Sequence, residues 1–237
     1  MMEIIEIKKT ANYHYFLRDK KNITFHVKKD CEIDIDLFDN RFKLTFLIEK
    51  AKVKINIFSR KNIHLNSNFV LTKADLIING LSLVDDSQFN VKLQLEKSHV
   101  QVYHRVFTAK NNKNNLRISH NSVDCYSDVQ CVILGDEKAH IDVETTTVVK
   151  KNCPLNKAFQ NSQIIALNHQ VTGQLQPILK IANNQIQAAH AAVFKKISDD
   201  EMYYLLSRGL SKKAAKNLII KSYLSSEKYY QIVEELF

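Results

Sequence analysis

Hydrophobic and polar residues alternate along most of the chain. In the segment CEIDIDLF, for example, Ile33, Ile35 and Leu37 fall on one face of an extended backbone, and Asp34 and Asp36 fall on the other. The segments with this strand pattern span residues 13–17, 23–27, 31–38, 42–48, 53–58, 62–65, 75–84, 89–95, 99–107, 116–120, 129–134, 140–149, 162–167, 169–173 and 177–182. The pattern predicts a mainly β protein in which short strands follow one another closely.

The connections between these segments restrict the architecture. They are too short for the helical crossovers of a βαβ fold, so an antiparallel sandwich and a solenoid of stacked short strands are the two candidates. Sandwich hairpins commonly turn at Asn-Gly or Asp-Gly, and the chain offers one such pair, Asn79-Gly80. The other breaks are single polar residues or short polar clusters, including an Asn/Lys turn expected at residues 110–115. This favours the solenoid, a β-helix whose inward apolar residues stack from coil to coil.

The period changes from two to that of a helix near residue 185. Ser198 and Glu201 form a capping box, with two acidic residues between them at the positive end of the helix dipole. Gly209 suits the left-handed position that ends a helix, Ser211 can cap a second helix, and Ser225 or Ser226 is expected to begin a third. We therefore expect a β-helix over residues 1–192 and a small helical domain over residues 193–237.

The three helices are too short to be stable alone and must pack against something. The spacing predicts that the first buries Met202, Leu205 and Leu206. The second helix is expected to bury an apolar stripe made of Ala214, Ala215, Leu218 and Ile219. Because a solenoid leaves its end coils open, these helices are expected either to cover one end or to bind a partner.

Composition indicates the cellular compartment and restricts the class of partner. The first residues, MMEIIEIKK, lack the apolar region of a secretory signal, and no run of about 18 apolar residues occurs, so we expect a cytoplasmic protein without a membrane span. The four cysteines form no CxxC pair and are interpreted as reduced, buried thiols: Cys31, Cys125, Cys131 and Cys153. The net charge of +9 is spread in short lysine clusters, which favours a solvated surface over a specific nucleic-acid site.

Few residues stand out chemically. No common catalytic or nucleotide-binding motif is present. His99 and His104 lie five apart in a strand and therefore face opposite sides. Asp142 and Glu144 share a face and leave open a carboxylate pair of a glycan-active or glycan-binding solenoid. His190, which lies between small residues in AAHAA, can either bind a transition metal as a neutral imidazole or hold two elements together by hydrogen bonds.

The segment QPILKIANNQIQAAHAAVFKKISDDEMYYLLSRGLSKKAAKNLIIKSYL resembles the SufB/SufD core proteins of the SUF iron–sulfur cluster assembly system. The ordered features that carry the resemblance are Pro177-Leu179-Ile181, His190, Met202-Tyr203-Tyr204-Leu205, Ser207-Arg208-Gly209 and Ala215-Leu218-Ile219. The resemblance implies a right-handed parallel β-helix followed by a helical domain, and a scaffold without enzymatic activity.

The resemblance also implies partners and a site. The C-terminal helices would bind a SufC-type ABC ATPase, through Tyr203, Tyr204, Leu205, Arg208, Gly209, Leu210, Ala215 and Leu218. The β-helix would pair with a SufB-type subunit or a second copy. His190 would bind a transient iron–sulfur cluster or iron shared with that partner, with none held tightly by this chain alone. Ser162, where B-type chains have a cysteine, and Ala191, where they tend to have an acidic residue, make the chain SufD-like.

The sequence therefore predicts a cytoplasmic, non-enzymatic SufD-like scaffold subunit. The glycan-binding or glycan-active solenoid that uses Asp142 and Glu144 is the alternative, and a nucleic-acid-binding module ranks after it.

Overall fold

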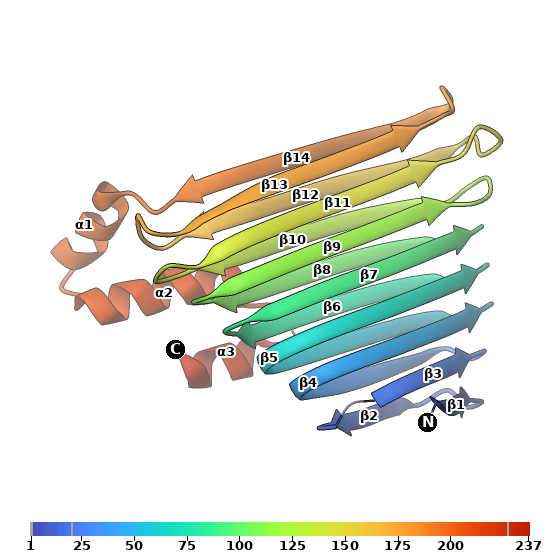
Figure 1. Cartoon of the computed structure of the whole chain (residues 1–237), viewed down its shortest axis with the longest axis horizontal. Coiled ribbons are helices and arrows are strands. Elements are labelled where there is room, and N and C mark those ends of the chain that lie inside the picture. Colours follow the sequence, from blue (N-terminus) through green and yellow to red (C-terminus); the bar gives the residue numbers. More distant parts are fainter. Residues whose placement is uncertain (1, 20, 227) are drawn as a thin grey trace.

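A computed structural model describes residues 2–19, 21–226 and 228–237. Within these ranges, fourteen strands form one continuous sheet with parallel pairing throughout, and three helices follow (Figure 1). The strands are β1 (Met2–Ile7), β2 (Asn12–Leu17), β3 (Lys21–Val27), β4 (Cys31–Glu49), β5 (Lys52–Thr72), β6 (Asp75–Val84), β7 (Ser87–Glu96), β8 (His99–Thr108), β9 (Asn111–His120), β10 (Tyr126–Gly135), β11 (His140–Val149), β12 (Asn156–Ala166), β13 (Thr172–Ile181) and β14 (Ile186–Lys196). This confirms a mainly β chain built as a parallel solenoid.

The strands form two faces of the solenoid. Face A contains β2, the first halves of β4 and β5, and then β6, β8, β10, β12 and β14, each paired with the next. Face B contains β1, β3, the second halves of β4 and β5, and then β7, β9, β11 and β13. The chain alternates between the faces, so each coil contributes one strand to each. Lys61, with a φ of 64°, lies where β5 passes from face A to face B.

The interior is filled by side chains that repeat from coil to coil. On face B, Phe25, Phe46 and Phe69 are register partners with stacked rings, and successive centroids lie 4.7 Å apart. On face A, Ile33, Ile55 and Ile78 form a corresponding aliphatic row, and all are buried. Since one strand spacing is about 4.8 Å, rings stacked in register approach van der Waals contact. The alternation in the sequence therefore encodes a common interior.

Two of the three helices begin close to the positions that the sequence predicts. They are α1 (Asp199–Ser207), α2 (Lys212–Leu224) and α3 (Tyr230–Leu236). The capping box of Ser198 and Glu201 is present, and Ser211 caps α2 by accepting from the backbone N–H of Ala214. Gly209 has a φ of +86°, as expected for a residue that ends a helix. The third helix begins later than predicted, because Ser225 ends α2 instead of starting α3.

Helices α2 and α3 pack on the outer surface of face A, where they leave the last coil uncovered (Figure 1). Their buried residues join outward-facing strand residues in a second apolar cluster: Phe58, Leu81, Leu134, Ile165, Ile220, Leu224, Tyr229 and Val233. The expected burial of Ala215 is confirmed, but that of Leu218 is wrong, because this side chain is 49% exposed. The other buried residues of α2 are Ile220 and Leu224. Helix α1 buries none of its residues, so its expected buried face is also wrong.

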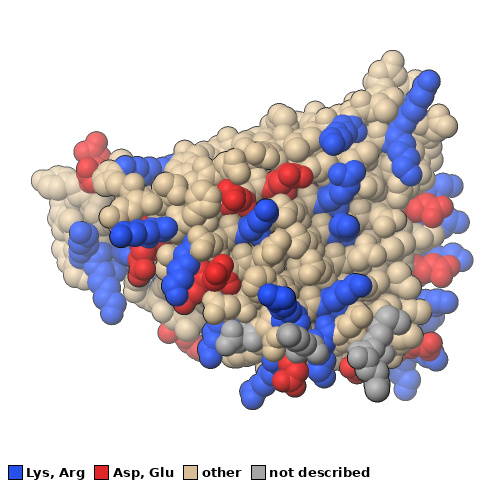
Figure 2. All heavy atoms as spheres, viewed as in Figure 1, with Lys and Arg blue, Asp and Glu red and all other residues tan. Residues whose placement is uncertain are grey.

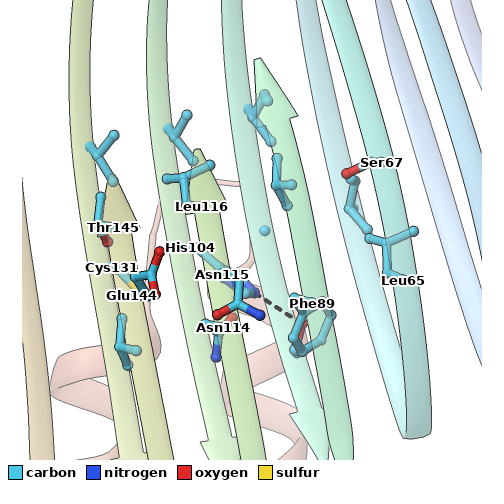
Figure 3. A pocket seen from close by; sticks show the side chains of 18 of the residues that line it. Leu65, Ser67, Phe89, His104, Asn114, Asn115, Leu116, Cys131, Glu144 and Thr145 are labelled. Atoms are coloured by element: carbon cyan, nitrogen blue, oxygen red, sulfur yellow. Dashed lines mark hydrogen bonds between the residues drawn. The ribbon is translucent and has the colours of Figure 1, made fainter. Parts of the chain in front are cut away.

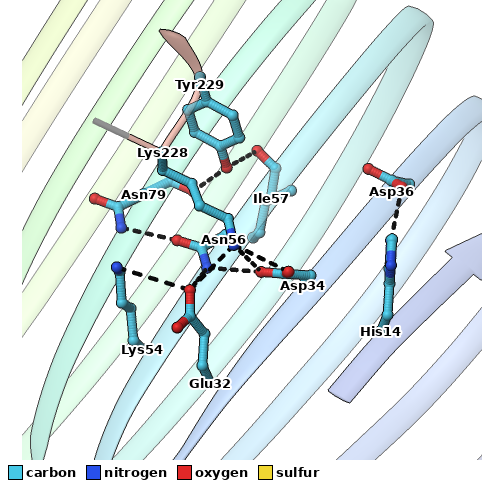
Figure 4. A network of polar contacts seen from close by, with 10 residues as sticks. All are labelled: His14, Glu32, Asp34, Asp36, Lys54, Asn56, Ile57, Asn79, Lys228 and Tyr229. Atoms are coloured by element: carbon cyan, nitrogen blue, oxygen red, sulfur yellow. Dashed lines mark hydrogen bonds and ion pairs between the residues drawn. The ribbon is translucent and has the colours of Figure 1, made fainter. Parts of the chain in front are cut away.

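A polar contact between the C-terminal segment and the early strands accompanies this apolar cluster (Figure 4). The hydroxyl of Tyr229 donates to the carbonyl oxygens of Asn79 and Ile57, at 2.9 Å and 3.1 Å. The Nζ atom of Lys228 lies 3.1 Å from a carboxylate oxygen of Glu32 and 3.0 Å from Asp34. These contacts join residues near the C-terminus to the first complete coils of the solenoid.

Two further features differ from the sequence pattern. The Asn/Lys turn expected at residues 110–115 is wrong, because β9 begins at Asn111. Asparagine is favourable here since Asn115 donates to Asn90, at 2.8 Å, and Asn90 donates to Asn66, at 2.9 Å. The expected boundary after residue 192 lies inside β14, which continues to Lys196; the division into two domains stays a prediction.

Candidate functional site

His190 lies in the middle of the last strand, at an inward-facing position. Its register partner on β12 is Gln160, which is 3% exposed and points into the solenoid. A parallel register keeps side chains of partners on the same side of the sheet, so the imidazole of His190 belongs to the interior row of face A. Because β14 is the last strand of its face among the described residues, the row ends here and His190 is exposed.

The layer below His190 is polar. Oγ1 of Thr147 lies 2.6 Å from the side-chain amide of Gln160, and the hydroxyl oxygens of Thr145 and Ser162 are 3.3 Å apart. All four side chains are buried. The inward neighbours of His190 on β14 are Ala188 and Ala192, which leave space on both sides of the ring. The last coil therefore presents one imidazole above a layer of hydrogen-bonding groups.

The open end of the solenoid combines apolar side chains with unpaired strand edges. Ile181, Val193 and Phe194 are 39%, 43% and 46% exposed, and Phe194 stacks in register on the buried Ile164. Strands β13 and β14 end the two faces, so each has one edge without a neighbouring strand in the described part of the chain. Such an edge can accept a further strand or another chain.

Helix α1 presents a second exposed surface, away from His190. Tyr203 is 72% exposed and Tyr204 is 58% exposed, and the guanidinium of Arg208 lies 5.3 Å from the centroid of the Tyr204 ring. Leu218 on α2 is also exposed, and a groove of about 490 Å³ runs between α1 and α2, with Tyr204 and Leu205 on its lining. Exposed aromatic and arginine side chains are the types that dominate protein interfaces.

The remaining residues expected at the partner surface have different environments. Ala215 is fully buried, whereas Leu205 and Leu210 are half-buried. A Cβ atom added to Gly209 would meet no atom within 4 Å, so this glycine is required by its backbone conformation and has open space around it. The expected set therefore divides into exposed side chains, Tyr203, Tyr204, Arg208 and Leu218, and the more buried Leu205, Leu210 and Ala215.

The other histidines and the carboxylate pair lie at separate places. His99 is exposed and 3.0 Å from Asp75, whereas His104 faces the interior, which confirms that the two point to opposite sides. Asp142 and Glu144 share the outer surface of β11, as predicted. Within the described ranges, no three His, Cys, Asp or Glu side chains are grouped as a metal site.

The sequence pattern did not indicate that two histidines, His104 and His120, lie in the interior. Burial lowers the pKa of both His104 and His120 to about 4. In the sequence His104 differs little from an exposed histidine, because its surroundings come from strands of several coils. The one available signal is the register: Gly80, one coil earlier, leaves room for a ring.

The surface charge shows no single basic patch on the face seen in Figure 2, where Lys and Arg side chains are interspersed with acidic ones. The four thiols are free, and three of them are buried, with Cys31 half-buried. No helix in the described ranges is long and apolar enough to cross a membrane.

The fold and the open, histidine-bearing end define a parallel β-solenoid with a C-terminal helical segment. Residues 8–223 match the family model described as SUF system FeS cluster assembly, SufBD core domain, so the chain belongs to the SufBD core family. This confirms the resemblance carried by the C-terminal segment.

Curated relatives are similar over shorter stretches. The iron–sulfur cluster assembly protein SufD of Bacillus subtilis (strain 168) is 35% identical over 68 residues, which cover 29% of this chain and 16% of that protein. An iron–sulfur cluster assembly SufBD family protein of Staphylococcus aureus (strain USA300) is 30% identical over 60 residues, 25% of this chain and 13% of that protein. The matched segments thus span less than a fifth of either relative.

Proposed function

We propose that this chain is a SufD-like scaffold subunit in iron–sulfur cluster assembly. It presents His190 to an iron ion or iron–sulfur cluster shared with a partner, and it binds a SufC-type ABC ATPase through α1 and the α1–α2 groove. It acts in the cytoplasm and catalyses no reaction of its own. The observation that carries the proposal is the position of His190 at the inward, uncovered end of the solenoid in a SufBD family member.

The donor set supports a site that is shared between two chains. Imidazole is a suitable ligand for iron. His190 is the one residue of this open end that we assign as a ligand, and no group of three potential ligands occurs in the described ranges. A cluster or iron ion bound here would need further ligands from the partner. The exposed Ile181, Val193 and Phe194 and the free edges of β13 and β14 offer that partner, a SufB-type subunit or a second copy, a surface beside His190.

The helical surface supports a second partner that binds independently. Tyr203 and Tyr204 lie on α1, beyond the last strand, while His190 lies in the middle of β14. No residue of α1 is fully buried, and its two tyrosines expose large aromatic faces. An ATPase on this surface would leave the open end of the solenoid free, so both partners can bind at once.

The test of the shared site is the substitution His190→Ala, with His169→Ala as the control. Both histidines are exposed, so neither change should alter folding. In cells that depend on this chain, we expect His190→Ala to lower iron–sulfur enzyme activity by about tenfold or more, as loss of a metal ligand or its support does, and His169→Ala to leave it unchanged. Normal activity with His190→Ala, at equal protein level, would refute the assignment.

A further inference from the structure

An internal cavity lies between the two faces of the solenoid, well below the open end (Figure 3). Its volume is about 60 Å³, room for a small guest, and its lining is mostly apolar. His104 on β8 and Cys131 on β10 line it from neighbouring strands of face A, and both carry metal-binding side chains. Glu144 on β11 is also part of the lining, but its side chain is exposed on the outer surface and accepts from Oγ1 of Thr146. His104 and Cys131 are register partners, so their backbones are about one strand spacing, roughly 4.8 Å, apart.

The orientation of the imidazole leaves one ring nitrogen free. The Cδ2 edge of His104 lies against Gly80, where a Cβ atom would approach it to 2.8 Å. On the same side, Nε2 lies 3.4 Å from Oγ of Ser82. In the tautomer with its proton on Nε2, the imidazole donates to this hydroxyl, and the lone pair of Nδ1 is available to bind a metal ion. Nδ1 belongs to the opposite edge of the ring, and Cys131 is the neighbour of His104 on that opposite side.

Face B contributes two unpaired polar atoms to the same cavity. Oγ of Ser67 and Oδ1 of Asn114 are buried and have no hydrogen-bond partner among the described residues. The residues themselves are 4% and 5% exposed. Buried polar atoms are nearly always paired, and a bound water or ion is one explanation for an atom that is not. A cavity with two unpaired polar atoms opposite a histidine and a thiol is therefore expected to bind a small ligand or ion.

We propose that His104 Nδ1 and Cys131 Sγ bind one soft monovalent metal ion, Cu⁺, inside the solenoid. A thiolate and an imidazole form a two-coordinate site, and Cu⁺ is one of the soft ions that thiolate ligands favour. With metal–nitrogen and metal–sulfur distances of about 2.0 and 2.3 Å, as measured for zinc, a linear unit spans roughly 4.3 Å, close to one strand spacing.

The charge balance fits an apolar cavity. On binding, the S–H bond of Cys131 breaks, the S–Cu bond forms, and the proton leaves to solvent, while copper stays in the +1 state. The thiolate neutralises Cu⁺ and the imidazole is neutral, so no net charge is buried. Zn²⁺ would leave one positive charge and require more ligands than are present. Burial raises the pKa of Cys131 to about 12, so the metal must displace the proton.

The site is separated from the open end by two coils. Ser162 on β12 is the register partner of Cys131, and Ala192 on β14 is the register partner of Ser162. Both are small, and Ala192 is exposed. An ion entering from the open end would therefore pass two small inward side chains in this row.

The test is anaerobic loading of the intact chain with Cu⁺ supplied as its bicinchoninate complex, followed by removal of excess complex and measurement of copper per chain. We expect one Cu⁺ per chain, with one sulfur and one nitrogen ligand in its X-ray absorption spectrum. Cys131→Ser should lower the bound copper at least tenfold. Cys31→Ser removes the half-buried thiol at another place and should retain it.

No bound copper in the wild-type chain, or equal binding by wild type and Cys131→Ser, would overturn the proposal. So would loss of binding in Cys31→Ser, since this places the ion at the surface. If Cys131→Ser does not fold, His104→Phe, which keeps a ring against Gly80, provides the second variant: copper should be lost or should lose its nitrogen ligand, and an unchanged spectrum would contradict the site.

Discussion

Helices α1 and α2 begin with equivalent signals and have opposite surroundings. Each is capped by a serine whose hydroxyl accepts a backbone N–H, at Ser198 and Ser211. Helix α1 buries no residue, whereas α2 buries Ala215, Ile220 and Leu224 against the outer surface of face A. Local signals therefore determine where a helix begins, and tertiary packing determines which of its residues are buried. We interpret α2 and α3 as the attachment of the helical segment and α1 as its binding surface.

The largest expected difference between the two helices is in stability. Leu224→Ala removes a side chain with no exposed surface from the cluster on face A and should lower the free energy of unfolding by about 2–5 kcal/mol. Leu206→Ala, on α1 at 38% exposure, should change it by about 0.5 kcal/mol or less. Urea unfolding monitored by circular dichroism measures both. Equal effects would show that α1 is also part of the packed structure.

A smaller effect is expected at Tyr229. In Tyr229→Phe the carbonyl oxygens of Ile57 and Asn79 lose their shared donor, while the ring can keep its place in the apolar cluster. Both carbonyls lie in strands that are paired on both sides, so they lose an additional donor and keep their place in the ladder. A net loss of about 0.5–1.5 kcal/mol should lower the urea midpoint without a change in slope. A midpoint equal to that of the wild type would mean that this hydroxyl adds nothing to the attachment.

The smallest effect concerns Lys228, and it depends on pH. Burial tends to raise the pKa of Glu32 and Asp34, but hydrogen bonds from Lys228 and Asn56, with the charge of Lys228, outweigh it and lower both pKa values from 4.5 and 3.8. Carboxyl groups with a lowered folded-state pKa stabilise the fold above their unfolded pKa values, and this stability is lost as pH falls through the folded-state values.

Lys228→Met should therefore lower the free energy of unfolding by less than about 1 kcal/mol near neutral pH, because these groups are partly exposed. The difference from the wild type should shrink as pH falls below 4. Lys221→Met, which removes the pair with Glu234 and leaves the Glu32–Asp34 contact in place, is the control. A difference between wild type and Lys228→Met that grows in acid would contradict the assignment of this pH dependence to Lys228.

The sequence allowed the solenoid and the helix starts at Ser198 and Ser211 to be predicted, because alternation and caps are local signals. The same locality explains the errors. The segment 111–115 looked like a turn, but it is part of a strand in which Asn115 donates to Asn90 and Asn112 donates to Ser87, each one coil away. The buried side of α2 faces Leu81 and Leu134, which lie far from it in the sequence, so helical spacing alone identified Ala215 and missed Ile220 and Leu224.

Only part of the candidate site could be predicted, for a related reason. His190 was found through a family resemblance, and the register then placed it in the interior row, which no local pattern reveals. The tyrosines of α1 were expected to bind a partner and are exposed, but Ala215 from the same set is buried. His104 and Cys131 meet only through the pairing of β8 with β10, twenty-seven positions apart along the chain.

The most direct test of the central claim is hydrogen exchange of the intact chain with and without a SufC-type ATPase. The account predicts slower amide exchange in α1 and at the α1–α2 connection when the ATPase is bound, and no change in α3. The double substitution Tyr203→Ala/Tyr204→Ala should abolish this effect. The control Tyr230→Ala, which removes an exposed tyrosine of α3, should retain it. Binding that leaves exchange in α1 unchanged, or that survives the double substitution undiminished, would contradict it.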